Sequence, residues 1–269
     1  MRTAVRASLE EDGALDDVTT LSVVPEDLSL RAQVVVKEEG ILAGLAALPV
    51  TFSEVDERVE VQLLTEDGAA ASPGEPIARL SGPARAILTG ERTALNLVSH
   101  LSGIATTTGA LVERSGTAEV VDTRKTLPGL RALQKHAVRC GGGVNHRFGL
   151  SDAVLVKDNH IAAVGSVTEA VGRAKTSGLP VQCEVESAAE LREALEAGAD
   201  SLLLDNRSIA ELTELVELAR SMRPHIPLEA SGGITVQTIE AVAATGVDRI
   251  SVGALTHSAP ALDISLRVC

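Results

Sequence analysis

Short apolar runs recur through the second half of the chain, and segments with helical periodicity separate them. Strands that are buried on both faces of a parallel sheet are apolar along most of their length. The alternation of such runs with helical segments therefore predicts a series of βα units. The six runs are AEVVD at 118–122, AVLVK at 153–157, VQCEVE at 181–186, SLLLDN at 201–206, PLEAS at 227–231 and RISVGA at 249–254.

The segments between these runs carry helix start and stop signals. Three of them open with Ser-x-x-Glu, a pattern in which the serine hydroxyl caps the first helical turn. Glycines stand where these helices or their neighbours should end. The start signals are Ser166 to Glu169, Ser187 to Glu190 and Ser208 to Glu211, and the glycines are Gly178, Gly198 and Gly246.

The first hundred residues follow a different pattern. Strand-like runs lie within 30–45, 57–68 and 75–88, and Asp67-Gly68 and Pro73-Gly74 are turn signals between them. Residues 91–114 then place apolar side chains on one stripe of a helix. We therefore predict a separate α+β domain, with the domain boundary inside this helix.

Polar residues gather at the carboxyl ends of the six runs. Six βα units are fewer than the eight of a complete barrel, so an incomplete barrel and an open sheet are both compatible with the count. An open sheet gathers its ligand groups at one switch point, whereas here almost every run ends in polar residues. We therefore favour the barrel. These residues are Asp122, Arg124, Lys125, Lys157, Asp158, Asn159, Glu184, Glu186, Asp205, Asn206, Ser231 to Gly233 and Gly253.

The composition limits the core and the partners. The chain has 269 residues, of which 45% are apolar, with two Phe and no Tyr or Trp, so the core must consist of Ala, Val, Leu and Ile. The net charge is −13, yet residues 122–160 carry seven Lys or Arg against three Asp; this segment is +4, which leaves −17 for the rest. An acidic surface disfavours nucleic acid and anionic membranes as partners. The basic segment instead indicates a compact anionic ligand.

Cysteine usage and the amino-terminal sequence indicate a soluble cytoplasmic protein. Cys140, Cys183 and Cys269 are far apart and form no Cys-x-x-Cys pair, so neither a disulfide framework nor a zinc site is predicted. Cys183 is expected to be a buried core residue. The acidic start is unlike a signal peptide, and the longest apolar stretch, GILAGLAALPVTF, is too short to span a bilayer.

The basic segment supplies cations at two neighbouring strand ends. Arg124 and Lys125 follow the first run, Lys157 ends the second, and His146 and Arg147 lie between them. Each alone could be a surface charge or part of a surface ion pair. Together they predict a site for carboxylates or phosphates, which arginine binds with two parallel hydrogen bonds. Arg131 and Lys135 are explained by an exposed helical face.

Acids and glycines at the later strand ends complement these cations. Glu184 and Asp205 could hold a hard cation or ribose hydroxyls, and Glu184 is preferred to Glu186, which could start the next helix. The Ser231 to Gly233 and Ser251 to Ala254 loops could cradle a phosphate, although each alone could be only a tight turn. Gly141 is expected to cap the preceding helix.

With these residues in place, the sequence resembles the quinolinate phosphoribosyltransferase family over nearly its whole length. The resemblance implies an α/β sandwich domain at 1–103, joined by 262–269, and at 104–261 an incomplete (β/α) barrel of about six to seven strands, the type II phosphoribosyltransferase fold. The sequence departs from the family where ALDDVT lacks a glycine, and at His136 and Val144, where aromatics are common. The stretches that carry the resemblance are 90–106, 122–161, 183–186, 202–206, 229–234 and 251–266.

The resemblance implies an activity and a partner. The family transfers a phosphoribosyl group from 5-phosphoribosyl 1-diphosphate to quinolinate with Mg²⁺, and releases nicotinate mononucleotide, diphosphate and CO₂ in de novo NAD biosynthesis. It also implies a homodimer or a higher oligomer, in which Arg92 reaches the partner's site.

By the same resemblance, each site residue has a role. Quinolinate is expected at Arg124, His146, Arg147 and Lys157, together with Arg92, and Thr123 is expected to bind substrate as well. Lys125 would lie between the two substrates, and Glu184 and Asp205 near the ribose and the Mg²⁺-diphosphate; these three are the expected catalytic residues. The 5-phosphate would bind Ser231, Gly232, Gly233, Gly253 and Ala254.

Three other interpretations remain open at this point. One is a related phosphoribosyltransferase-like protein encoded with molybdate transport, against which the intact basic motifs argue. Another is an aldolase that uses Lys157 as a Schiff base. The third is a phosphoribosyl-binding protein without catalytic activity, which the full set of acids and bases disfavours.

Overall fold

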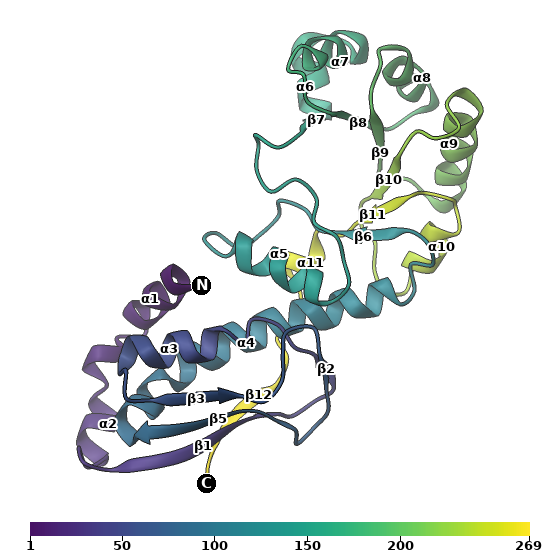
Figure 1. Ribbon diagram of the computed structural model, residues 1–269. Helices are drawn as coiled ribbons and strands as arrows, with labels where there is room; N and C mark the ends of the chain where they lie inside the picture. Colours follow the sequence, from purple (N-terminus) through teal and green to yellow (C-terminus); the bar gives the residue numbers. More distant parts are fainter. The chain divides into compact units, whose positions relative to one another are not determined.

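The computed structural model describes residues 1–269, and the chain folds into two compact units, each with its own sheet (Figure 1). Unit 1 comprises residues 1–109, 126–142 and 255–269, and unit 2 comprises residues 110–125 and 143–254. None of the helices combines the length and the apolar composition that a bilayer crossing requires.

Unit 1 contains a four-stranded antiparallel sheet in the order β12-β1-β5-β3. Helices α3 and α4 lie over one face of this sheet (Figure 1). The core is aliphatic apart from Phe52, which is fully buried, as the composition predicted. The elements are α1 (Arg2–Glu11), η1 (Ala14–Asp16), α2 (Val18–Val23), β1 (Ser29–Val36), β2 (Gly40–Ile41), α3 (Ala47–Val55), β3 (Glu60–Leu63), β4 (Ala70–Ala71), β5 (Pro76–Pro83), α4 (Ala84–Val112), α5 (Arg131–Cys140), α11 (Ala254–His257) and β12 (Ile264–Val268).

The last strand of the chain completes the sheet of unit 1. β12 pairs antiparallel with β1, with Ala32 opposite Val268 and Val36 opposite Ile264. Ile264 and Leu262 are buried in the core of this unit. The carboxyl end of the chain is therefore a structural part of the unit that contains the amino end.

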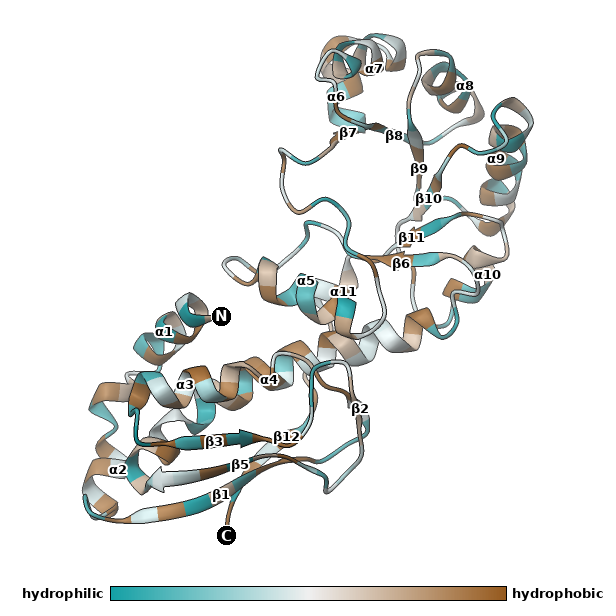
Figure 2. Cartoon of the chain, in the orientation of Figure 1, coloured by the Kyte–Doolittle hydropathy of each residue, from teal (hydrophilic) through white to brown (hydrophobic).

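Unit 2 contains a six-stranded parallel sheet in the order β6-β11-β10-β9-β8-β7, and these are the six strands that the sequence predicted. The sheet curves as an incomplete barrel with β6 and β7 at its edges, and α7, α8 and α9 cover its outside (Figure 1). Figure 2 shows apolar and polar residues alternating along α9, as expected of an amphipathic helix. The elements are β6 (Glu119–Val121), β7 (Val154–Val156), α6 (Asp158–Val164), α7 (Val167–Lys175), β8 (Val181–Val185), α8 (Ala188–Glu196), β9 (Ser201–Asp205), α9 (Ile209–Met222), β10 (Leu228–Ser231), α10 (Ile239–Ala243) and β11 (Arg249–Ser251).

The three predicted helix starts are confirmed. The hydroxyl groups of Ser166, Ser187 and Ser208 each accept a hydrogen bond from the backbone N–H three residues later. Only at Ser208 is the bond reciprocal, because Glu211 accepts from the Ser208 backbone N–H at 2.8 Å. Each of the three predicted stop glycines adopts a left-handed conformation after a helix, with φ of +73° at Gly178, +90° at Gly198 and +88° at Gly246.

Of two expectations for the α5 region, one was wrong and one is confirmed. Lys135 does not lie on an exposed face, because only 1% of the surface of this residue is exposed. The four-residue spacing does place Arg131 and Lys135 on one side of α5, but that side is partly packed against the protein: Arg131 is half-buried and bonds Thr126. At the end of the helix, Gly141 is the C-cap, as expected, and Gly142 after it adopts the left-handed conformation, with φ of +85°.

Candidate active site

A pocket of about 470 Å³ opens at the carboxyl ends of the strands of unit 2. Side chains of a parallel strand alternate between the two faces of the sheet. Cys183, Leu202 and Leu204 are fully buried, whereas their neighbours Glu184, Leu203 and Asp205 line the pocket. The pattern confirms that the polar ends of the predicted strands meet at one edge of the sheet.

Most of the predicted site residues lie in this pocket, and a few do not. Gly232, Gly233, Gly253 and Ala254 follow the ends of β10 and β11 without lining it. Arg92 is an exposed residue of α4 in unit 1. The predicted residues that line the pocket are Thr123, Arg124, Lys125, His146, Arg147, Lys157, Glu184, Asp205 and Ser231, and the further ones are Asp122, Leu155, Asp158, Leu203, Glu229 and Ser251.

Two guanidinium groups form the basic part of the pocket. Burial and the neighbouring charge of Arg124 lower the pKa of Arg147. Arg147 donates one hydrogen bond, from Nη1 to the Ala153 carbonyl at 3.1 Å. The Arg124 Nε atom is buried without a hydrogen-bond partner. Because an unmet buried donor is costly, Arg124 is arranged for an acceptor from outside the chain.

Asp122 shapes the loop that carries His146 and Arg147. It is fully buried at the end of β6, and its two carboxylate oxygens accept from Asn145 Nδ2 at 2.6 Å and from the His146 backbone N–H at 3.0 Å. Asp122 was expected among the strand-end polar residues, without a role of its own. Its contacts make it a residue that positions the loop.

His146 is held by hydrogen bonds on both ring nitrogens. Nδ1 accepts from the Arg147 backbone N–H at 2.8 Å, so the proton of the neutral ring is on Nε2. Nε2 lies 3.1 Å from Gln182 Oε1 and 3.3 Å from Glu229 Oε2. The protein therefore holds the imidazole ring through both nitrogens, and the ring is not free to offer both of them to a ligand.

Glu229 is the site residue that the sequence analysis missed. It is 2% exposed in the middle of β10, and it accepts from Gln182 Nε2 at 3.0 Å. Burial by itself raises its pKa, but hydrogen bonds from His146, Gln182 and Ser251 outweigh burial and leave the pKa below its ordinary value. A charged residue inside the apolar run PLEAS was the signal that could have found it.

The acidic part of the pocket is formed by Glu184 and Asp205 on neighbouring strands. Glu184 has only 6% of its side chain exposed and is paired with the Lys157 ammonium group. Asp205 is half-buried and accepts from Asn206 Nδ2 at 2.9 Å. Two carboxylates that face one pocket offer the oxygen ligands that Mg²⁺ prefers when substrate phosphates supply the rest.

The loops after β9 and β10 interlock beside Asp205. Asn206 is the one residue other than glycine with a positive φ, +53°. Gly232 has φ of +102°, and a Cβ atom there would lie 2.2 Å from Asn206 Oδ1. The close approach requires glycine at 232 and leaves the backbone of this turn beside the pocket.

The barrel is parallel and incomplete, and one pocket at its strand ends contains both cations and carboxylates. This is the architecture of a barrel enzyme that acts on small polyanionic substrates. The quinolinate phosphoribosyl transferase N-terminal and C-terminal domains match residues 17–102 and 104–267. The chain therefore belongs to the quinolinate phosphoribosyl transferase family.

Relatives and solved structures agree with this assignment. The nicotinate-nucleotide pyrophosphorylase (carboxylating) of Mycobacterium leprae is 44% identical over 272 residues, covering 98% of this chain and 96% of the relative. A structure of the nicotinate-nucleotide pyrophosphorylase from Francisella tularensis superposes with a TM-score of 0.91 at 42% identity, over 98% of this chain and 94% of that one. A NadC deletion mutant superposes with a TM-score of 0.94 at 40% identity, over 100% and 96% of the two chains.

Proposed function

We propose that this chain transfers the phosphoribosyl group of 5-phosphoribosyl 1-diphosphate to quinolinate and releases nicotinate mononucleotide, diphosphate and CO₂, a step of de novo NAD biosynthesis. The family and the relatives named carboxylating pyrophosphorylases support this reaction. The observation that carries it in this chain is the buried, unpartnered Nε of Arg124 next to Arg147. Quinolinate has two adjacent carboxylates, and two guanidinium groups suit them.

The proposed division of the pocket follows its charges. Thr123, Arg124, Arg147 and Lys157 bind quinolinate, and His146 forms one wall of this half. Lys125, at the exposed rim, lies between the two substrates. Glu184 and Asp205 face the ribose and the diphosphate, and Ser231 and the glycine turns at 232–233 and 253–254 receive the 5-phosphate through their backbone N–H groups.

In the proposed reaction the protein contributes mainly orientation and electrostatics. The bond between ribose C1 and diphosphate breaks, and its electron pair leaves with diphosphate. The lone pair of the pyridine nitrogen forms the new bond to C1. Glu184 and Asp205 stabilise the positive character that develops at C1.

Decarboxylation follows from the charge of the new pyridinium ring. The bond between C2 and its carboxylate breaks, CO₂ departs, and the electron pair that stays on C2 takes up one proton. Arg124 and Arg147 must therefore orient the acid without binding the departing carboxylate too strongly. Mg²⁺ is proposed as the cofactor; Glu184 and Asp205 would hold it, and when bound it neutralises charge on the diphosphate.

The direct test supplies the purified protein with quinolinate, phosphoribosyl diphosphate and Mg²⁺ and follows nicotinate mononucleotide and CO₂. Nicotinate is the matched control acceptor, because it lacks the carboxylate that leaves. Product from quinolinate and none from nicotinate supports the proposal. Binding of phosphoribosyl diphosphate without product from either acceptor would contradict it.

We further propose a homodimer or a larger assembly of such pairs, in which Arg92 completes the partner's site. Mixing an Arg92→Ala chain with a Glu184→Gln chain tests this. In a mixed dimer one site would have both native residues, so random exchange should restore about one quarter of the wild-type activity. Recovery above the activity of either variant alone supports Arg92 acting in the partner's site, and no recovery despite verified exchange rejects it.

A further inference from the structure

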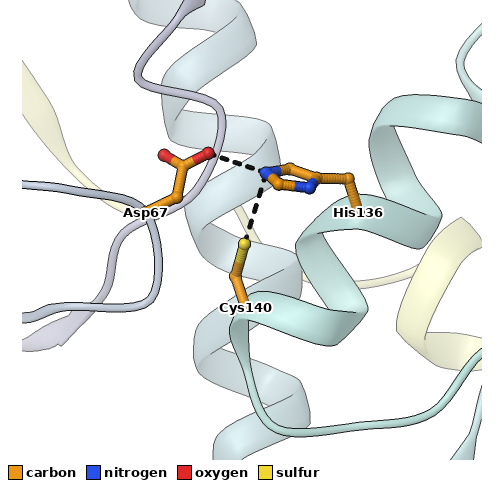
Figure 3. Close-up of side chains that lie close together, drawn as sticks. All are labelled: Asp67, His136 and Cys140. Carbon is orange, nitrogen blue, oxygen red and sulfur yellow. Dashed lines mark hydrogen bonds and ion pairs between the residues drawn. The ribbon is translucent and has the colours of Figure 1, made fainter.

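Unit 1 contains a cluster of three metal-ligating side chains that the proposed reaction does not use. Asp67, His136 and Cys140 each direct one ligand atom inward, and these atoms all lie within 4.8 Å of one another (Figure 3). His136 Nε2 is 2.7 Å from Asp67 Oδ2 and 3.4 Å from Cys140 Sγ.

The scaffold holds these three side chains in place. His136 and Cys140 are one turn apart on α5 and therefore share a face. The buried Gln134 fixes this helix by donating to the Thr256 carbonyl at 2.7 Å. Asp67 lies in the turn between β3 and β4, where its Oδ1 accepts from the Leu45 backbone N–H at 2.9 Å. This bond leaves Oδ2 directed at His136, as an outer hydrogen bond orients a metal ligand.

The spacing of the ligand atoms is close to that of a tetrahedral zinc site. With bonds of about 2.0 Å to nitrogen and oxygen and about 2.3 Å to sulfur, tetrahedral ligands lie about 3.3–3.5 Å apart. The distance from Cys140 Sγ to His136 Nε2 already fits. The distance from His136 to Asp67 must open by about half an ångström when a metal replaces the shared proton.

An ion can reach the cluster from solvent. The side chains of His136 and Asp67 are 40% and 24% exposed, and Cys140 is half-buried. A water molecule can therefore occupy a fourth ligand position.

We propose that Asp67, His136 and Cys140 bind one Zn²⁺ ion, which joins the β3–β4 turn to α5. A sulfur, a nitrogen and an oxygen ligand favour a borderline ion such as zinc over Mg²⁺, which prefers oxygen alone. Binding releases the thiol proton of Cys140 to solvent and shifts the ring proton of His136 from Nε2 to Nδ1, which leaves the ion bound to thiolate, neutral imidazole and carboxylate. Cysteine spacing concealed the site, because only one ligand is a cysteine and Asp67 is 69 residues from His136.

The test titrates the metal-free, full-length protein with Zn²⁺ against a chromophoric chelator, in a large excess of Mg²⁺. One equivalent should bind, and Co²⁺ in place of Zn²⁺ should give a thiolate-to-cobalt charge-transfer band in the near ultraviolet. The chain has no Trp or Tyr to absorb in that region. Zn²⁺ should also raise the melting temperature followed by circular dichroism.

Three variants test the ligands one by one. Cys140→Ser and His136→Gln should each weaken Zn²⁺ binding by about a hundredfold, and Cys140→Ser should also remove the cobalt band. Asp67→Asn keeps an acceptor for the Leu45 N–H, so this variant should still fold. It should weaken Zn²⁺ binding by about tenfold. Circular dichroism checks that each variant is folded.

Cys269→Ser is the matched control, because it removes the exposed thiol and leaves the cluster intact. Its Zn²⁺ affinity and cobalt band should equal those of the wild type. Equal affinity in the wild type and Cys140→Ser, loss of binding in Cys269→Ser, or no charge-transfer band would each overturn the zinc site. The Asp67–His136 contact would then be a hydrogen bond between two parts of unit 1 and nothing more.

Discussion

The ammonium group of Lys157 is paired with the carboxylate of Glu184 across the ends of two neighbouring strands. The register of β7 and β8, with Val156 opposite Cys183, places these two residues side by side. One belongs to the proposed quinolinate half of the pocket and the other to the ribose half. The substrate carboxylate must therefore compete with Glu184 for Lys157, which links the binding of the two substrates.

Separate substitutions of Lys157 and Glu184 should affect different kinetic constants, KM for quinolinate and kcat. Lys157→Gln should raise KM for quinolinate by about tenfold, because a charged partner is lost. Glu184→Gln should lower kcat by about a hundredfold through weaker stabilisation at C1. The double variant should lose less than the product of the two, since the residues are in contact. Steady-state kinetics measure these effects. Lys175→Gln is the control, because it breaks only the exposed pair with Asp200, and its kcat and KM should match those of the wild type.

The buried Glu229 should give a stability effect that depends on pH. Its pKa is lower in the folded protein than in the unfolded chain, so its ionised form contributes stability that is complete above about pH 4.5 and is lost as the pH falls through the folded pKa. Glu229→Gln should lower stability by about 1–3 kcal/mol at pH 7, and by less at pH 4.

Thermal unfolding by circular dichroism at the two pH values checks this expectation. Glu119→Gln is the control, because Glu119 is exposed at the start of β6 and pairs only with Arg249 there. Its difference from wild type should stay within about 0.5 kcal/mol at both pH values. An equal loss for Glu229→Gln at pH 7 and pH 4 would show that the charge of Glu229 does not stabilise the fold.

Alanine substitutions at two glycines with nearly the same φ should distinguish the cost of steric crowding from the cost of backbone strain. Gly232 at +102° and Gly165 at +99° both disfavour a side chain, but only Gly232 would place a Cβ against Asn206. Gly165→Ala should cost about 1–2 kcal/mol of stability. Gly232→Ala should cost about 1–3 kcal/mol more and reduce activity. Denaturant unfolding of both variants measures the difference, and equal losses would contradict the crowding.

The three thiols should react at very different rates. Burial raises the pKa of Cys140 to about 11 and that of the fully buried Cys183 to about 12, while Cys269 is exposed. Only the thiolate attacks a disulfide reagent, and at pH 8 roughly one Cys140 in a thousand is ionised. One fast equivalent is therefore expected in native protein, and Cys269→Ser should abolish it. Two fast thiols would show that the region around Cys140 opens readily.

The sequence predicted the barrel well because the signals for its strands and helices come from residues that are close together in the chain. A buried parallel strand is a run of apolar residues, and Ser208 caps a helix three residues from its partner Glu211. The preference for Glu184 over Glu186 was also local, because Glu184 lies within β8 and lines the pocket, whereas Glu186 lies beyond Val185, the last residue of that strand. These features need no knowledge of distant contacts.

The features that the sequence did not show depend on distant contacts. Gln182 and Glu229 are 47 residues apart, and only the sheet register brings them together around His146. Burial of Lys135 depends on which side of α5 is packed, and spacing along the helix does not determine this. The Asp67–His136 contact likewise joins parts of the chain that no local motif connects.

The pairing of β12 with β1 has a consequence for biosynthesis. A ribosome makes β1 early, but its neighbour β12 comes only after all the strands of unit 2. Until β12 has left the exit tunnel, one edge of β1 has unpaired backbone groups that can join another nascent chain. The barrel strands are all complete before that moment, so co-translational folding should finish unit 2 first, although the amino terminus belongs to unit 1.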